Sequence, residues 1–197
     1  MAQSETSLDS NYTLYRTDVL MDFNDPYARF GEVPSFTLTS EDASTGQPLA
    51  AANRGPSHGG TDTSPQLSWS GFPAETKSFA VTCFDPDAPT GSGFWHWSVY
   101  NIPATVTSLA AGAGDPNSPL LPTGAATVPN EFRTTHYIGS APPEGTGTHR
   151  YFFVVHALDV ETLELDPQST PAILGFNMHF HTLARAVIVP ISTFGDK

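Results

Sequence analysis

Three side chains that can bind an anion or move a proton stand beside loops shaped by proline and glycine: Asp85, His96 and His149. A carboxylate can orient an imidazole or accept a hydrogen bond from a protonated ligand, and an imidazole can donate to an oxyanion. One carboxylate and two imidazoles therefore predict a small site for an anionic group, provided that the fold brings them together. The same residues also fit a tight turn beside a hydrogen-bonded core histidine, and the sequence leaves this alternative open.

Two consecutive strands would position the first two of these side chains. Residues 79–84 (FAVTCF) are mostly apolar, which is typical of a buried strand, and Asp85 ends the run. After Pro89 and a glycine-containing turn, residues 94–100 alternate as a second strand. The alternation predicts that Trp95, Trp97 and Val99 share one face and that Phe94, His96, Ser98 and Tyr100 share the other.

A loop would deliver the second imidazole. Residues 137–149 have the sequence YIGSAPPEGTGTH, in which two prolines stiffen the chain and the glycines let backbone N–H groups approach a ligand closely. Such a loop is a candidate anion-binding concavity. It places His149 at the start of a strong strand predicted over residues 150–158.

The remaining elements are short. Strands are predicted over 36–39 and 64–69, and residues 45–62 form a loop in which His58 is interpreted as solvated. A helix is predicted over 175–186, followed by a closing strand over 187–191. The helix rests on apolar residues at helical spacing, namely Phe176, Phe180, Leu183, Ala184 and Val187.

Two segments lack such patterns. The polar residues 1–25 are expected to form an N-terminal arm, and residues 26–197 a single domain. Residues 109–129 are rich in alanine, glycine and proline without a usable period, and a loop of this length is often functional or mobile.

Composition narrows the fold and the partners. Only 14% of the 197 residues are charged, and 18 prolines and 16 glycines favour many short strands joined by turns, a mostly all-β class. The formal net charge of −12 opposes binding to nucleic acid or to an anionic membrane surface. No stretch is long and apolar enough for stable membrane insertion, and no secretory signal is evident, so a cytoplasmic protein is expected.

Several other side chains have simpler interpretations. Cys83, the only cysteine, lies in the apolar 79–84 run and is interpreted as a small hydrophobe. His156 is interpreted as a core histidine. His179 and His181 are disfavoured as a metal pair because residues at i and i+2 do not share a helix face. Asp87 is expected either to join the site or to support it by pairing with Arg150.

The quoted motifs resemble a known family. DPDAP (85–89), FWHW (94–97), NIP (101–103) and PPEGTGTHRY (142–151) look like the two signature regions of the phosphatidylethanolamine-binding proteins, in particular the bacterial Raf-kinase-inhibitor-like branch. TSPQLSW (63–69) resembles the strand before the first signature, and HTLA (181–184) resembles the closing helix. The resemblance covers roughly residues 33–189 and is specific because both signatures occur together.

The resemblance implies a fold and a site. The fold would be a large antiparallel sheet packed on a smaller one, with a few short helices including one near the C-terminus. The site residues would be Asp85, His96, Pro143, His149 and Tyr151, with Trp95 as a pocket wall and backbone donors around Gly139 and Ala141. The chain departs from the family pattern at Ala141, where many members have glycine, and at Thr148.

These observations predict a non-enzymatic binding protein without cofactor or metal, whose small pocket takes phosphate or a phosphoethanolamine-like group. The alternative is an interaction module that inhibits a kinase or protease, with residues 109–129 as its contact surface. A third hypothesis is a phosphate-ester hydrolase that uses Asp85 and His149, which is disfavoured because no activated nucleophile is evident. The sequence also leaves open whether the protein forms a homodimer.

Overall fold

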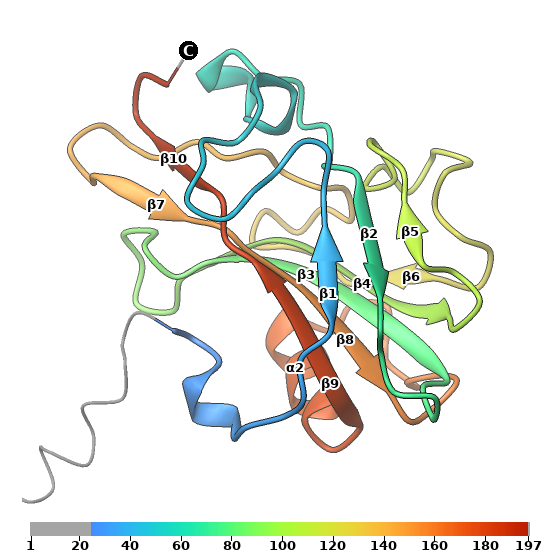
Figure 1. The fold of residues 1–197 in the computed structure, drawn as a ribbon. Helices are drawn as coiled ribbons and strands as arrows, with labels where there is room; N and C mark the ends of the chain where they lie inside the picture. Colours follow the sequence, from blue (N-terminus) through green and yellow to red (C-terminus); the bar gives the residue numbers. More distant parts are fainter. Residues whose placement is uncertain (1–24, 197) are drawn as a thin grey trace, which may run out of the picture. The chain divides into compact units, whose positions relative to one another are not determined.

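The computed structural model describes residues 25–196 (Figure 1). Residues 33–196 belong to one compact unit, and residues 25–32, which include the short 3-10 helix η1 (Ala28–Phe30), belong to a separate unit. The predicted N-terminal arm falls almost entirely outside the described residues. None of the helices within residues 25–196 combines the length and hydrophobicity that a membrane crossing requires.

A five-stranded antiparallel sheet forms the centre of the compact unit. Its strands, in spatial order, are β6 (Ala126–Thr127), β4 (Phe94–Pro103), β3 (Ser78–Asp85), β8 (Phe152–Leu158) and β9 (Thr182–Ile188). The central strand β3 is buried on both faces, which explains why its sequence is mostly apolar rather than strictly alternating.

Two smaller sheets complete the β structure, and the mostly all-β prediction is confirmed. One has the antiparallel order β1 (Thr37–Thr39), β2 (Leu67–Ser70) and β5 (Ser108–Leu109). The other pairs β7 (Thr148–Arg150) with β10 (Ile191–Thr193). The helices of this unit are η2 (Ala51–Asn53), η3 (Pro56–His58) and α2 (Pro171–His179).

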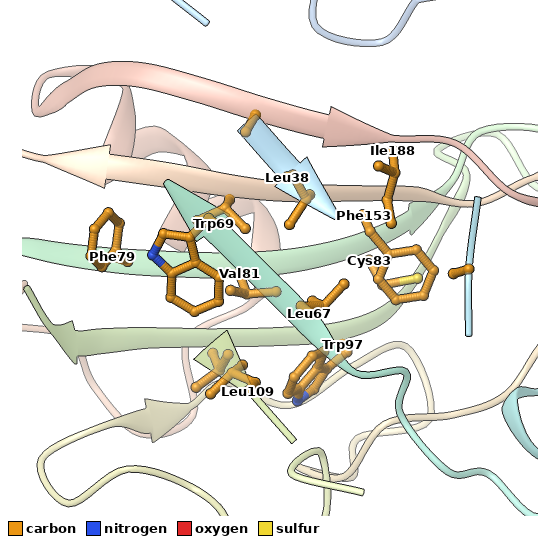
Figure 2. Close-up of a cluster of buried hydrophobic side chains, with 14 of the residues drawn as sticks. Leu38, Leu67, Trp69, Phe79, Val81, Cys83, Trp97, Leu109, Phe153 and Ile188 are labelled. Atoms are coloured by element: carbon orange, nitrogen blue, oxygen red, sulfur yellow. The ribbon is translucent and has the colours of Figure 1, made fainter. Parts of the chain in front are cut away.

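The main hydrophobic core lies between the large sheet and the β1–β2–β5 sheet, as predicted. Figure 2 shows Leu67 and Trp69 of β2 lying against side chains of the large sheet, including Val81 and Cys83. Cys83 is fully buried there, and burial together with the nearby Asp85 charge raises the pKa of its thiol well above the usual value. A buried neutral thiol is a poor nucleophile, so its interpretation as a small hydrophobe is confirmed.

The opposite face of the large sheet is covered by α2. Leu174 and Met178 of this helix pack in a second cluster with Ala80, Tyr100 and Leu158. His156 is also buried, and burial lowers its pKa to about 3. The prediction of a core histidine is confirmed.

The predicted C-terminal helix is wrong in its boundaries. The helix begins at Pro171, capped by the Thr170 hydroxyl, which accepts from the Ile173 N–H, and it ends at His179. Residues 182–188, expected to continue the helix and start a closing strand, form β9 and alternate with Ala184, Ala186 and Ile188 buried. A run of apolar residues satisfies a helical and a strand period together, and pairing with β8 decides in favour of the strand.

The predicted alternation of side chains in β4 is also wrong near the start of the strand. Cys83 pairs with Trp97 but Phe84 pairs with Trp95, so His96 is an extra residue in β4, a β-bulge. Because paired residues share a face, Trp95 and Trp97 lie on opposite faces of the sheet. The ring of Trp95 accordingly stacks on Phe84, at 4.4 Å between centroids. A bulge at this position re-aims His96, which a strict period of two cannot predict.

The long 109–129 segment is more ordered than its composition indicates. Its two ends form parts of β5 and β6, and the loop between them is tied to Ser64 by hydrogen bonds from the Gly112 and Gly114 N–H groups. Leu120 in this loop is about half exposed.

Candidate functional site

The site begins at Asp85, where β3 ends. Its Oδ1 accepts hydrogen bonds from the N–H groups of Asp87 (2.8 Å) and Ala88 (3.0 Å), which folds the DPDA segment into a turn around the carboxylate. Gly93 closes this turn with φ = 73°, and a Cβ there would lie 2.4 Å from the Phe84 ring. The turn therefore requires glycine, and it leaves Asp85 only 2% exposed.

His149 is delivered by the short strand β7. Its Nδ1 lies 2.7 Å from Oδ2 of Asp85, although 64 positions separate them in sequence, and its exposure is 1%. Its Nε2 lies 2.8 Å from Oγ1 of Thr146, whose hydroxyl donates to the Pro143 carbonyl at 2.7 Å. The predicted meeting of the carboxylate and this imidazole is therefore present in the fold.

The directions of these three hydrogen bonds follow from the acceptor at each end. A carbonyl oxygen can only accept, so the single Thr146 proton points to Pro143. The Thr146 oxygen must then accept from an N–H at Nε2 of His149. All three bonds are satisfied together when a proton also lies between Nδ1 and Oδ2 of Asp85, and the buried pair then has no net charge.

Tyr151 lies next to this pair. Its side chain is buried, and burial together with the Asp85 charge raises its pKa. The Tyr151 ring also meets the His96 ring edge-on, at 5.1 Å between centroids. Tyr151 therefore connects the buried pair to the second imidazole.

His96 has one fixed and one open nitrogen. Its Nδ1 lies 2.8 Å from the Ile138 carbonyl oxygen, which requires Nδ1 to donate. No group among residues 25–196 hydrogen-bonds its Nε2, and this atom is not among the fully buried side-chain atoms without a partner, so it retains contact with solvent. Burial lowers the pKa of His96, against the raising effect of the Ile138 bond and of Asp85.

The backbone donors predicted around Gly139 are mostly used inside the protein. The Gly139 N–H donates to the Asp62 carboxylate at 2.7 Å, and the Ser140 N–H donates to the Asn53 carbonyl at 3.3 Å. A Cβ on Gly139 would lie 2.2 Å from the Arg54 carbonyl carbon, so this glycine permits close packing with that segment. Ala141 is exposed, and within the described part of the chain its N–H has no hydrogen-bond acceptor.

The structure does not bring every predicted side chain to the carboxylate. Trp95 lies on the sheet face opposite to Asp85, because its partner Phe84 and Asp85 are consecutive in β3. Pro143 is exposed, and its part in the site is the carbonyl that accepts from Thr146. Asp87 forms a two-point ion pair with Arg150, at 2.7 and 2.8 Å. The second of the two roles considered for Asp87, structural support, is the one observed.

Sequence reasoning missed two supporting residues. His58, interpreted as solvated, lies with Nε2 3.0 Å from the Pro142 carbonyl, to which it donates. The two residues are 84 positions apart in the sequence, so no local sequence pattern predicts this contact. Thr146 was treated as loop composition, although a hydroxyl three residues before a histidine is a recognisable local partner.

The other histidine pair has separate surroundings. His181 contacts Asp159 at 2.8 Å, and the His179 ring packs on Phe180. Over residues 25–196, no three His, Cys, Asp or Glu side chains gather in a way that could hold a metal ion.

A polar cavity of about 440 Å³ lies away from the carboxylate–imidazole pair. Its lining residues are Thr61, Asp62, Thr63, Gly112, Gly114, Asp115, Ser118 and His136. The cavity is linked to the site through Asp62, which lines it and accepts from the Gly139 N–H. The preceding residue, Ile138, has the carbonyl that accepts from His96.

The chain is similar to known proteins over most of its length. The family model described as phosphatidylethanolamine-binding protein matches residues 39–192, which include every site residue named above. The chain belongs to this family. The resemblance of the two signature motifs is therefore confirmed, and the match extends beyond β9 to residue 192.

Relatives in bacteria match over most of the family domain. YbhB of Escherichia coli strain K12 is 47% identical over 153 residues, which are 77% of this chain and 96% of YbhB. YbcL of the same organism is 44% identical over 162 residues, and its crystal structure, titled as a new member of the mammalian PEBP family, superposes with a TM-score of 0.78 over 81% of this chain and 99% of that one. A homologue from Chlamydia trachomatis, 29% identical, gives a TM-score of 0.68 over 81% of this chain and 97% of that one.

Proposed function

We propose that this phosphatidylethanolamine-binding protein family member is a non-enzymatic binding protein whose Asp85–His96–His149 site takes a small oxyanion such as phosphate or a phospholipid head group. The observation that supports this most is the buried Asp85–His149 pair, in which the carboxylate orients an imidazole ring whose other N–H faces a loop hydroxyl. An ionised donor gives strong hydrogen bonds to an oxyanion, and a recessed site shields it from the acidic surface.

The loop hydroxyl indicates how the anion would enter. Thr146 is held as an acceptor for Nε2 of His149 by its own bond to the Pro143 carbonyl and by the turn between Gly145 and Gly147, both with positive φ. An anion oxygen would replace the Thr146 oxygen as the acceptor, and the Thr146 hydroxyl would move away from Nε2 to make room for it. The exposed Ala141 N–H would be a second donor to the anion.

The test is calorimetry of the full chain with methyl phosphate at fixed ionic strength. The variant His149→Gln should bind about tenfold to hundredfold more weakly, as expected for a lost charge-assisted hydrogen bond. The matched control is His181→Gln, because that histidine also pairs with a carboxylate but lies outside the site. No detectable binding by the natural chain, or equal affinities for all three proteins, would overturn the proposal.

A hydrolase is the second candidate, and one contact favours it. Carboxylate, imidazole and hydroxyl follow one another in Asp85–His149–Thr146 at 2.7 and 2.8 Å, the spacing of an activated nucleophile. This contact weakens the earlier argument that no nucleophile is present. However, the Thr146 proton points to Pro143, so the imidazolium donates to the hydroxyl and is not in position to act as its base.

The substitution Thr146→Val separates the two candidates. If the site binds anions, removal of the competing oxygen should leave methyl phosphate affinity unchanged or increase it. If the site is hydrolytic, any turnover of phosphate or acyl esters by the natural chain should disappear in this variant. We expect no turnover above background in either protein. Inhibition of a kinase or protease remains the alternative binding role, tested by the same variants against a panel of such enzymes.

A further inference from the structure

His96 adds a requirement that the proposed function does not contain. The Ile138 carbonyl fixes its Nδ1 as the donor, so in the neutral ring the open Nε2 is an acceptor. An acceptor-only anion would place its lone pairs against this nitrogen. The initial expectation that both histidines donate to the anion therefore fits His149 but not neutral His96.

We infer that the site selects oxyanions that carry their own proton, such as a phosphate monoester monoanion, over anions without a donor, such as phosphate diesters and sulfate. This inference rests on the proposed function, because it assumes that an anion occupies the Asp85–His149 site. The ligand O–H would donate to Nε2 of His96, while a ligand oxygen accepts from His149. His96 would then recognise the proton of the ligand, and His149 would recognise its negative charge.

The surroundings of His96 support a neutral ring. The charged groups that act on it are Asp85 at the end of β3, His149 on β7 and Asp62 across the loop that carries Ile138. The carboxylates favour protonation and the His149 cation opposes it, and burial has the largest effect and lowers the pKa of His96. Asp85 is not placed to accept the ligand proton instead, because it is only 2% exposed and already accepts from His149 and from the two turn N–H groups.

The experiment compares two probes of equal charge. Methyl phosphate at pH 5.5 is mostly a monoanion with one O–H, since its second pKa is about 6, and dimethyl phosphate is a monoanion with none. The natural chain should bind methyl phosphate about tenfold to hundredfold more tightly, the effect of leaving a buried acceptor without a donor. In His96→Gln the ratio should fall toward one, because a side-chain amide can present either its oxygen or its NH₂ group.

The control and the contrary outcomes separate this inference from the proposed function. His136→Gln, an exposed histidine in the separate polar cavity, should keep the ratio of the natural chain. Equal binding of both probes by the natural chain overturns the inference and leaves the proposed function standing. A ratio that persists in His96→Gln also overturns it, because the second methyl group is then simply too large. Binding of neither probe overturns the proposed function itself.

Sulfate gives an independent measurement. Because it has no proton to donate, it can bind only if His96 takes up a proton from solvent. Calorimetry in buffers of different ionisation enthalpy should therefore detect about one extra proton taken up with sulfate compared with methyl phosphate at pH 5.5. Equal uptake for the two anions would contradict the inference.

Two sources can supply a phosphate monoester, a soluble metabolite or the head group of a phosphatidic acid. The net charge of −12 opposes an anionic lipid surface, so we expect the soluble source. Glycerol 3-phosphate should bind as methyl phosphate does, and the protein should not sediment with phosphatidic acid vesicles. Sedimentation that requires His149 would assign the lipid as the source and would keep the requirement for a proton.

Discussion

Asp85 and Asp87 stand two residues apart in the same turn, yet their surroundings are opposite. Asp85 and its partner His149 have side-chain exposures of 3% and 1%, whereas Asp87 and its partner Arg150 have exposures of 27% and 26%. The partners are consecutive residues of β7, so one points inward and the other outward. The inner pair is shielded from solvent, and the outer pair braces the turn against the strand.

The two pairs are also linked to each other. The Asp87 N–H donates to Asp85, and Asp87 in turn accepts from the Arg150 N–H at 3.0 Å as well as from its guanidinium. The outer pair thereby fixes the register between the turn and β7, which sets the distance from Asp85 to His149. A motif that looks like two equivalent acids therefore contains one buried acid at the proposed binding site and one partly exposed acid that supports the turn.

The largest expected effect comes from breaking the inner pair. The variant Asp85→Ala leaves the His149 Nδ1–H and two backbone N–H groups without their acceptor. Urea unfolding should show a loss of about 3–5 kcal/mol in the free energy of unfolding, the effect of leaving a buried charge unpaired. The control Asp159→Ala breaks an exposed carboxylate–histidine pair and should cost less than about 1 kcal/mol. Equal losses of stability in Asp85→Ala and Asp159→Ala would show that burial does not make the inner pair contribute more than the exposed pair.

The second effect is on the pH dependence of stability. His96, beside the inner pair, and Asp87, in the outer pair, should affect stability in different pH ranges. The pKa of His96, beside the inner pair, is lowered by burial, so the unfolded chain binds more protons below pH of about 6.5. Stability should therefore fall as the pH falls from 6.5 toward the pKa of the folded state. The slope should not exceed about 1.4 kcal/mol per pH unit for this group.

Asp87 contributes in a lower range. Burial alone would raise its pKa, but the Arg150 hydrogen bonds and charge lower it overall. Its contribution is present above the unfolded pKa and is lost as the pH falls through the folded value, below about pH 4. Urea unfolding from pH 7 to 3 should show a shallower slope between pH 6.5 and 4 for His96→Gln, and a shallower slope below pH 4 for Asp87→Asn. If His96→Gln changed the slope only below pH 4 and Asp87→Asn only above it, the assignment of these pH ranges to the two residues would be contradicted.

How much of this site the sequence predicts depends on whether the signal is local. The strands around Asp85 and the family motifs identify the residues, because turn chemistry and alternation are properties of neighbouring positions. The sequence does not show the β-bulge at His96, which moves Trp95 to the opposite face. Nor does it show that the Gly139 N–H is taken by Asp62, 77 positions away. Both depend on pairing between distant segments, which no local pattern contains.

The third effect is smaller and concerns the outer pair alone. The variant Asp87→Asn removes the charge that meets Arg150 but keeps a side chain that can accept hydrogen bonds. We expect a loss of about 1 kcal/mol in the free energy of unfolding, the upper end for a partly exposed pair. Methyl phosphate affinity should change less than about threefold, because the inner pair stays intact. A tenfold loss of affinity with unchanged stability would instead place Asp87 in the binding site.

The smallest expected effect is the response of the two pairs to salt, and it tests the comparison directly. Ions screen charges over about 10 Å at 0.1 M salt and about 3 Å at 1 M, but they act mainly on charges that solvent reaches. A double-mutant cycle of Asp87→Asn and Arg150→Gln should therefore give a coupling energy that falls by a few tenths of a kcal/mol between 0.05 and 0.5 M NaCl. The corresponding cycle of Asp85→Asn and His149→Gln should keep its coupling energy, because both side chains are almost fully buried. Measuring both cycles in the same urea series makes each the control of the other. If salt weakened the inner coupling as much as the outer, solvent would have to reach the Asp85–His149 pair in the folded state, and the contrast between a recessed site and an exposed brace would fail.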